Sequence, residues 1–291
     1  MRVKRLVVYL LCAILVVLSG CSSNKTTKEV KTQPSEEKEI SMNYTNTPTI
    51  FLHGAGGGRS SMKGMINRFE EKGVAKKALV INVSTTGEVS VEKDLPTNHF
   101  EKDNPMIQVI FEDNRNNEWE QAKWIKSVLE FLQEKYDVKQ VNMVGHSMGG
   151  ISGLRYLLQD GSNQDLPKVE KLVALGSPYN EFIDTLNQQT LDELLTSGPT
   201  EKSERYLLYE QEIANMPKDV SFLLVGGKIS DDDLSDKIVP LSSAFAVKSL
   251  LTQHENHVEY MLVEGNGAEH SALHEHEGVD EAVSDFLWYK K

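Results

Sequence analysis

Short apolar runs alternate along the chain with longer segments in which apolar side chains recur at helical spacing. The clearest long segment, residues 117–135, predicts an amphipathic helix. Further helices are expected over residues 60–72, 151–158, 241–251 and 279–289. The apolar runs predict buried strands over residues 49–53, 78–83, 106–111, 169–175, 220–225 and 258–263. Strands that alternate with helices predict an α/β fold, with a mostly parallel sheet covered by helices on both faces.

Residues 179–217 interrupt this alternation. They are polar and helix-prone, and they lie between two expected core strands. We interpret them as a small helical lid over the site described below. The alternative is a solvent-facing insertion that has no part in substrate access.

Residues 1–20 have the form of a bacterial lipoprotein signal peptide, with a basic start, the apolar run 6–18 and small residues before Cys21. The run 6–18 is too short for the roughly 20 residues that cross a bilayer. A cysteine directly after Ser-Gly favours lipidation over an ordinary cleaved signal. We therefore expect a lipid anchor on Cys21, at the extracytoplasmic face of the cell membrane. Residues 21–46 are expected to be a flexible tether, which leaves 47–291 for the α/β domain.

Cysteine content and charge narrow the chemistry. The chain has two cysteines, Cys12 and Cys21, and the first is expected to leave with the signal. The mature chain then has no internal disulfide, no thiol nucleophile in its globular part and no cysteine-ligated zinc. The net charge is −12, and loss of the basic leader makes it more negative. An acidic surface disfavours nucleic acid and anionic membrane surfaces as partners, so a lipid would have to hold the protein at the membrane.

The motif Gly145-His-Ser147-Met-Gly149 follows an apolar, β-prone run that begins at residue 141. This is the form of a nucleophile elbow, a sharp strand-to-helix turn that exposes a serine hydroxyl. Side chains at Gly145 and Gly149 are expected to collide with the neighbouring strand and helix. The alternative is a glycine-rich turn that precedes a helix and has no catalytic role.

A serine nucleophile needs a base, and in hydrolases with this elbow the chain order is serine, acid, histidine. The base should follow the last core strand, 258–263, where His270 is well placed and His274 is the second choice. The acid should follow the strand 220–225. Asp236 is preferred there because it stands in Ser235-Asp236-Lys237-Ile238-Val239-Pro240, where the chain turns back toward apolar structure. The alternatives are the neighbouring aspartates Asp231, Asp232 and Asp233.

The oxyanion formed during acyl transfer needs two backbone amides. One is expected from Met148, directly after the serine, and the other from Ala55 in the glycine-rich loop 54–58. That loop fits neither a dinucleotide fingerprint nor a phosphate loop, because Arg59 stands where those motifs need glycine or lysine. No H-E-x-x-H motif accompanies the histidines of the tail, and we expect neither a metal nor an organic cofactor.

Five motifs in this order resemble one known family. They are His53-Gly54, the elbow, Gly176-Ser177-Pro178, Ser235-Asp236 and His270-Ser271. The chain over residues 47–291 is similar to the α/β-hydrolase-fold lipoproteins and cell-surface hydrolases of Gram-positive bacteria, a lipase- and esterase-like group whose substrates are poorly defined. The resemblance implies the α/β-hydrolase fold and a triad of Ser147, Asp236 and His270.

The sequence therefore predicts a serine hydrolase that acts on an acyl bond of a small molecule or a lipid, with a carboxylic ester as the preferred bond. An acyltransferase or amidase would use the same residues. The alternative outside enzymes is a lipoprotein that binds a ligand on this fold without turning it over.

Overall fold

The structure of the protein is a computed structural model that describes residues 41–290. The expected signal peptide, Cys21 and most of the expected tether lie outside the described residues. No helix among residues 41–290 is long and apolar enough to cross a membrane.

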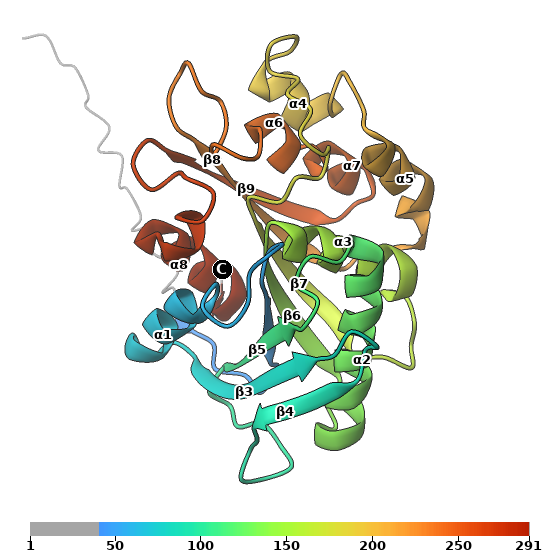
Figure 1. Ribbon diagram of the computed structural model, residues 1–291, viewed down its shortest axis with the longest axis vertical. Helices are drawn as coiled ribbons and strands as arrows, with labels where there is room; N and C mark the ends of the chain where they lie inside the picture. Colours follow the sequence, from blue (N-terminus) through green and yellow to red (C-terminus); the bar gives the residue numbers. More distant parts are fainter. Residues whose placement is uncertain (1–40, 291) are drawn as a thin grey trace, which may run out of the picture. The chain divides into compact units, whose positions relative to one another are not determined.

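Strands β2 to β9 form an eight-stranded sheet in the order β4-β3-β5-β2-β6-β7-β8-β9 (Figure 1). All neighbouring pairs are parallel except β3 and β4. The strands are β2 (Thr49–Leu52), β3 (Lys76–Val83), β4 (Val89–Lys93), β5 (Pro105–Phe111), β6 (Gln140–His146), β7 (Lys168–Leu175), β8 (Ser221–Lys228) and β9 (His257–Glu264).

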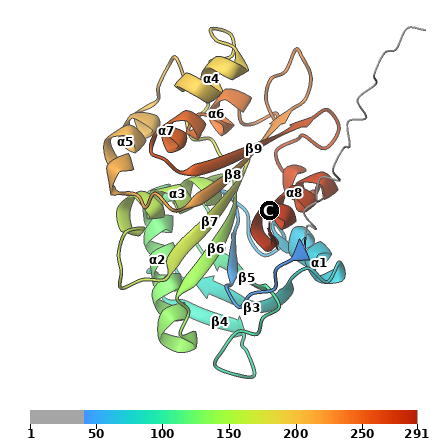
Figure 2. The same ribbon diagram turned by 180° about the vertical axis from the view of Figure 1, so that it is seen from behind.

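Helices cover both faces of this sheet, as the views from opposite sides show (Figures 1 and 2). The helices are α1 (Lys63–Glu71), α2 (Glu118–Tyr136), α3 (Met148–Asp160), α4 (Leu191–Ser197), α5 (Glu204–Glu212), α6 (Leu241–Ala244), α7 (Lys248–Gln253) and α8 (Glu277–Trp288), with 3-10 turns η1 (Ile213–Asn215) and η2 (Leu273–Glu275). Helices α1 and α8 lie on one face, and α2 and α3 on the other. The predicted fold class, α/β with helices on both faces of a mostly parallel sheet, is confirmed.

Strand β2 shows why both faces need cover. Phe51 points into the core beneath α1 and α8, where it contacts Phe69, which in turn contacts Trp288. Its neighbours Ile50 and Leu52 belong to the opposite core, against α2 and α3. Successive side chains of a strand point to opposite faces, so a strand that is apolar throughout requires an apolar layer on each side.

Two local predictions differ from the structure. Strand β4 was not expected, because it lies at the sheet edge and only alternate side chains, Val89 and Val91, are partly buried. The helix expected over 241–251 is instead two short helices, α6 and α7. Between them Phe245, Ala246 and Val247 are all fully buried, and three successive residues cannot lie on one face of a continuous helix.

Residues before the boundary expected at residue 47 already bond to the domain. Strand β1 (Ser41–Met42) pairs with β10 (Tyr289–Lys290), and the amide of Asn43 donates to the carbonyl of Trp288 at 2.7 Å. The amide of Thr45 donates to Asn104 Oδ1 at 2.8 Å. These bonds use mainly backbone groups, so the polar composition of residues 41–46 does not predict them.

Candidate active site

The expected site residues follow four different strands of the sheet. Ala55 follows β2, Ser147 follows β6, Asp236 follows β8 and His270 follows β9. The four strands are parallel, so their carboxyl ends lie along one edge of the sheet. Ligands of open α/β sheets bind at this edge.

Ser147 occupies a strained turn between β6 and α3. Its backbone has φ 53° and ψ −118°, an uncommon conformation for a residue with a side chain. Its amide donates to the carbonyl of Leu175 at 2.8 Å, which anchors the turn to β7. A Cβ at Gly145 would lie 2.4 Å from the carbonyl carbon of Gly149, and one at Gly149 would lie 2.6 Å from the carbonyl oxygen of Leu52. The turn thus has the geometry of a nucleophile elbow and requires glycine at both positions.

Replacing Gly145 with alanine should destabilise the fold by about 1–3 kcal/mol, because the new methyl group meets backbone atoms that cannot move aside. Urea unfolding monitored by tryptophan fluorescence measures the change. Gly58→Ala is the matched control, since a Cβ at Gly58 would meet no atom within 4 Å. Equal stability of the two variants would contradict the close approach at Gly145.

Asp236 and His270 form a buried pair. Asp236 Oδ2 lies 2.7 Å from His270 Nδ1, and the His270 amide donates to the Asp236 carbonyl at 2.8 Å. The other carboxylate oxygen, Oδ1, accepts from the amides of Ile238 at 3.0 Å and Val239 at 2.6 Å. A carboxylate that accepts these bonds requires the hydrogen of His270 on Nδ1. The lone pair is then on Nε2, where a general base needs it.

The alternative aspartates lie elsewhere. Asp231 forms an ion pair with Lys228 in which its own side chain is 97% exposed. Asp233 Oδ1 accepts from the hydroxyl of Ser235 at 2.5 Å. Asp232 is exposed. Asp236 is the aspartate of this loop that meets a histidine.

The other two tail histidines have separate roles. His274 Nδ1 lies 3.0 Å from Glu275 Oε1. His276 Nδ1 accepts from the amides of Gly278 and Val279 at 3.1 and 3.3 Å, so it caps the start of α8. Within residues 41–290, no group of three His, Cys, Asp or Glu side chains is arranged to hold a metal ion.

His146, directly before the serine, is a buried neighbour of the base that the sequence did not single out. Its ring lies between those of His270 and His274, at centroid distances of 4.6 and 4.7 Å. Its Nε2 is 2.9 Å from the His270 carbonyl oxygen. A carbonyl only accepts, so Nε2 carries the hydrogen. Burial, with the two neighbouring imidazoles, holds the pKa of His146 well below its usual value. The sequence feature that could have identified His146 is its place as a polar residue at the end of an apolar strand.

Acidification should destabilise the protein below about pH 6.5. Burial lowers the pKa values of His146, His53 and His274, so these imidazoles stay neutral in the folded state. The unfolded chain binds their protons from about pH 6.5 downward, which favours unfolding as the pH falls. Urea unfolding at about pH 7.5 and 5.5 measures the loss.

The matched variant is His146→Gln, whose amide retains a donor for the His270 carbonyl. It should lose less stability than the wild type between the two pH values. An equal loss would exclude His146 as a source of the pH dependence.

The two amides expected for the oxyanion are available. Among the residues that the structure describes, neither the amide of Ala55 nor that of Met148 donates a hydrogen bond, whereas the next amide of the loop, Gly56, donates to the Asn114 carbonyl at 2.7 Å. A Cβ at Gly54 would lie 3.0 Å from Ser147 Cβ. The close approach of the loop to the serine is thus made at Gly54.

A serine at a strand-to-helix elbow and a buried carboxylate–imidazole pair after later strands of a mostly parallel sheet define an alpha/beta hydrolase. The model of the family described as "alpha/beta hydrolase of unknown function (DUF915)" matches residues 36–290, and the chain belongs to this family. The family expected from the sequence motifs is thereby confirmed. No curated protein matches the chain.

Two solved structures are similar to this chain. A gene product of Listeria innocua shares 27% identity at a TM-score of 0.75, over 84% of this chain and 94% of that one. A Lactobacillus plantarum protein named "putative cell surface hydrolase" shares 18% identity at a TM-score of 0.64, over 84% of this chain and 90% of that one. The second similarity concerns the fold alone.

Proposed function

We propose that the protein is a serine hydrolase that cleaves carboxylic esters through Ser147, His270 and Asp236. The observation that carries the proposal is the buried hydrogen bond from His270 Nδ1 to Asp236, whose second oxygen is held by two backbone amides. A histidine fixed in this tautomer can serve as a general base for a serine on the same edge of the sheet.

The reaction runs in two halves. In the first, Ser147 Oγ attacks the ester carbonyl carbon while His270 Nε2 takes its proton, and the oxyanion accepts hydrogen bonds from the amides of Met148 and Ala55. His270 then protonates the leaving alcohol, which leaves an acyl-enzyme. In the second half, water attacks this ester with His270 again as base, and the acid is released. Each oxyanion donor contributes about 2.7–4 kcal/mol to lowering the barrier.

We propose the membrane address on the sequence alone. The leader and Cys21 place the enzyme on the extracytoplasmic face of the cell membrane, held by a lipid. An enzyme anchored there meets acyl substrates of the membrane and its surroundings. No cofactor is required for the proposed chemistry.

One experiment tests both parts. The full chain is purified from membranes in detergent, treated with a fluorophosphonate and its intact mass is measured. We expect loss of residues 1–20, a lipid mass on Cys21, and a single adduct that is absent from Ser147→Ala. The control Ser271→Ala alters an exposed serine next to His270 and should be labelled like the wild type. A folded wild type without an adduct would overturn the catalytic proposal in favour of a binding lipoprotein. A chain with no added lipid would overturn the anchor.

A further inference from the structure

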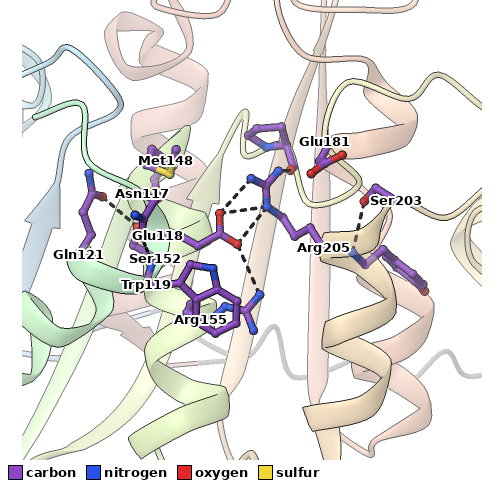
Figure 3. A network of polar contacts seen from close by, with 12 residues as sticks. Asn117, Glu118, Trp119, Gln121, Met148, Ser152, Arg155, Glu181, Ser203 and Arg205 are labelled. Atoms are coloured by element: carbon purple, nitrogen blue, oxygen red, sulfur yellow. Dashed lines mark hydrogen bonds and ion pairs between the residues drawn. The ribbon is translucent and has the colours of Figure 1, made fainter.

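The first turn of α2 carries a buried carboxylate that contacts two arginines from different parts of the chain (Figure 3). Glu118 accepts from Arg205 Nε at 3.1 Å and from Arg205 Nη2 at 2.9 Å, and its Oε1 lies 3.4 Å from Arg155 Nη2. The side chains of Arg155 and Glu118 are 0% and 7% exposed. Helices α2, α3 and α5 therefore meet around charges that water does not solvate.

Helix α5, which belongs to the polar insertion, presents one face to this cluster. Arg205, Tyr209 and Glu212 lie on the same side of the helix. Glu212 Oε2 is 2.6 Å from Arg155 Nη1. The Arg155 guanidinium lies 3.7 Å from the ring centre of Trp119 and 4.9 Å from that of Tyr209. The guanidinium is thus enclosed by α2 on one side and by the insertion on the other.

Arg205 also contacts the segment that borders the Asp236–His270 pair. Its Nη1 donates to the carbonyl of Pro178 at 3.2 Å. Two residues earlier, a Cβ at Gly176 would lie 2.9 Å from Asp236 Oδ2 and 3.2 Å from His270 Nδ1. Arg205 is therefore bonded to the chain two residues from the glycine that packs against the base and its carboxylate.

The insertion is attached a second time at its start. The amide of Asn180 donates to Ser243 Oγ at 3.0 Å, and the amide of Thr185 donates to Ser242 Oγ at 3.1 Å. All four residues are buried. An outward movement of the insertion would have to break these bonds together with the arginine contacts.

We infer that the insertion, together with the Gly176-Ser177-Pro178 segment before it (residues 176–217), is a fixed wall of the active site that does not open as a lid. We also infer that Glu118 and Arg205 are positioning residues that act on the Asp236–His270 pair through Pro178. Lifting α5 would separate Arg205 from Glu118 and Glu212 from Arg155, leaving the buried Glu118 and Arg155 with only their mutual contact at 3.4 Å. Substrate then enters without movement of the insertion. The positioning role rests on the proposed function, whereas the fixed wall does not.

Hydrogen exchange and fluorophosphonate labelling of the full chain test the two parts. In the wild type, amides of α5 should exchange as slowly as those of α2. Glu118→Gln removes the central charge, and Arg205→Lys keeps a charge but cannot bond Glu118 twice and also reach Pro178. Both should speed exchange within 176–217 by at least about tenfold. Both should also slow labelling of Ser147 by at least about tenfold and shift the pH midpoint of labelling.

Lys202→Ala is the control, since Lys202 precedes α5 and its partly exposed ion pair with Glu210 faces away from the Glu118 cluster, so it should change neither quantity. Wild-type α5 amides that exchange as fast as exposed loops would overturn the fixed wall. Faster exchange with labelling and pH midpoint equal to those of Lys202→Ala would overturn the positioning role. If the α2 amides of Glu118→Gln also exchange faster, the milder variant Arg205→Lys is used to test the positioning role. An unlabelled wild type would refute the proposed function. The hydrogen-exchange rates of the α5 amides would still test whether the wall is fixed.

Discussion

Asp236→Asn should lower kcat/KM for a short-chain ester by about 10⁴-fold while the protein stays folded. The asparagine side chain keeps the size of the aspartate and can still accept from the amides of Ile238 and Val239 through its oxygen. Its NH₂ group would then face His270 Nδ1 and donate to it. The imidazole would be held with its hydrogen on Nε2, where it cannot accept the proton of Ser147, and the negative charge that stabilises imidazolium would be lost.

Steady-state hydrolysis of p-nitrophenyl acetate by the full chain in detergent measures the effect. Asp233→Asn is the matched control, because it makes the same change in the same loop at a residue that contacts Ser235 and no histidine. The control should retain wild-type activity. Comparable losses in both variants, or a loss in Asp233→Asn alone, would contradict the assignment of Asp236 as the residue that orients the base.

The fold and the candidate triad were accessible from sequence because they depend on chain order and on local patterns. The elbow motif is contiguous, and its glycines are required by contacts within a few ångströms. Asp236 and His270 were expected because each follows a strand, and parallel strands end on one edge of the sheet. The preference for Asp236 over its neighbours came from the turn back to apolar residues, and the same turn supplies the amides of Ile238 and Val239 that hold its carboxylate.

What the sequence did not predict depends on contacts between distant segments. Glu118 and Arg205 are separated by 87 positions, and each looks like an ordinary surface residue of a helix. Arg155 lies within an apolar helix, yet nothing local shows which carboxylates would meet it. His146 occupies the variable position of the elbow motif, which gives no information about its contacts. Its burial between two imidazoles becomes visible when the loops after β9 are placed beside β6.

These unpredicted contacts change how the insertion is understood. A polar helical segment between core strands suggests a lid, since polarity implies exposure and weak attachment. In the structure part of that polarity lies at an interface with the domain, where Arg205 bonds Glu118 and the backbone amide of Asn180 donates to the buried Ser243 hydroxyl. Polar residues here join the insertion to the domain. Composition alone cannot distinguish a solvated face from a buried polar interface, because both are built from the same residue types.

The stability of this interface should depend most on Arg155. Arg155→Ala should lower the free energy of unfolding by about 3–5 kcal/mol, because it removes a guanidinium that is fully buried between Trp119 and Tyr209 and paired with Glu212. For a domain of this size, such a loss corresponds to a decrease in Tm of about 10 °C. Thermal unfolding and urea titration measure it.

Arg155→Met distinguishes lost packing from lost charge. Methionine fills much of the same space and needs no ionic partner, while Glu118 keeps Arg205 and Glu212 can turn toward solvent, since it is 29% exposed. We therefore expect Arg155→Met to be clearly more stable than Arg155→Ala. Lys168→Ala, which breaks an exposed pair with Asp219, should change stability by less than about 1 kcal/mol. If Arg155→Ala were no more harmful than Lys168→Ala, the buried cluster would not hold the insertion in place, and a lid that opens would again be the better interpretation.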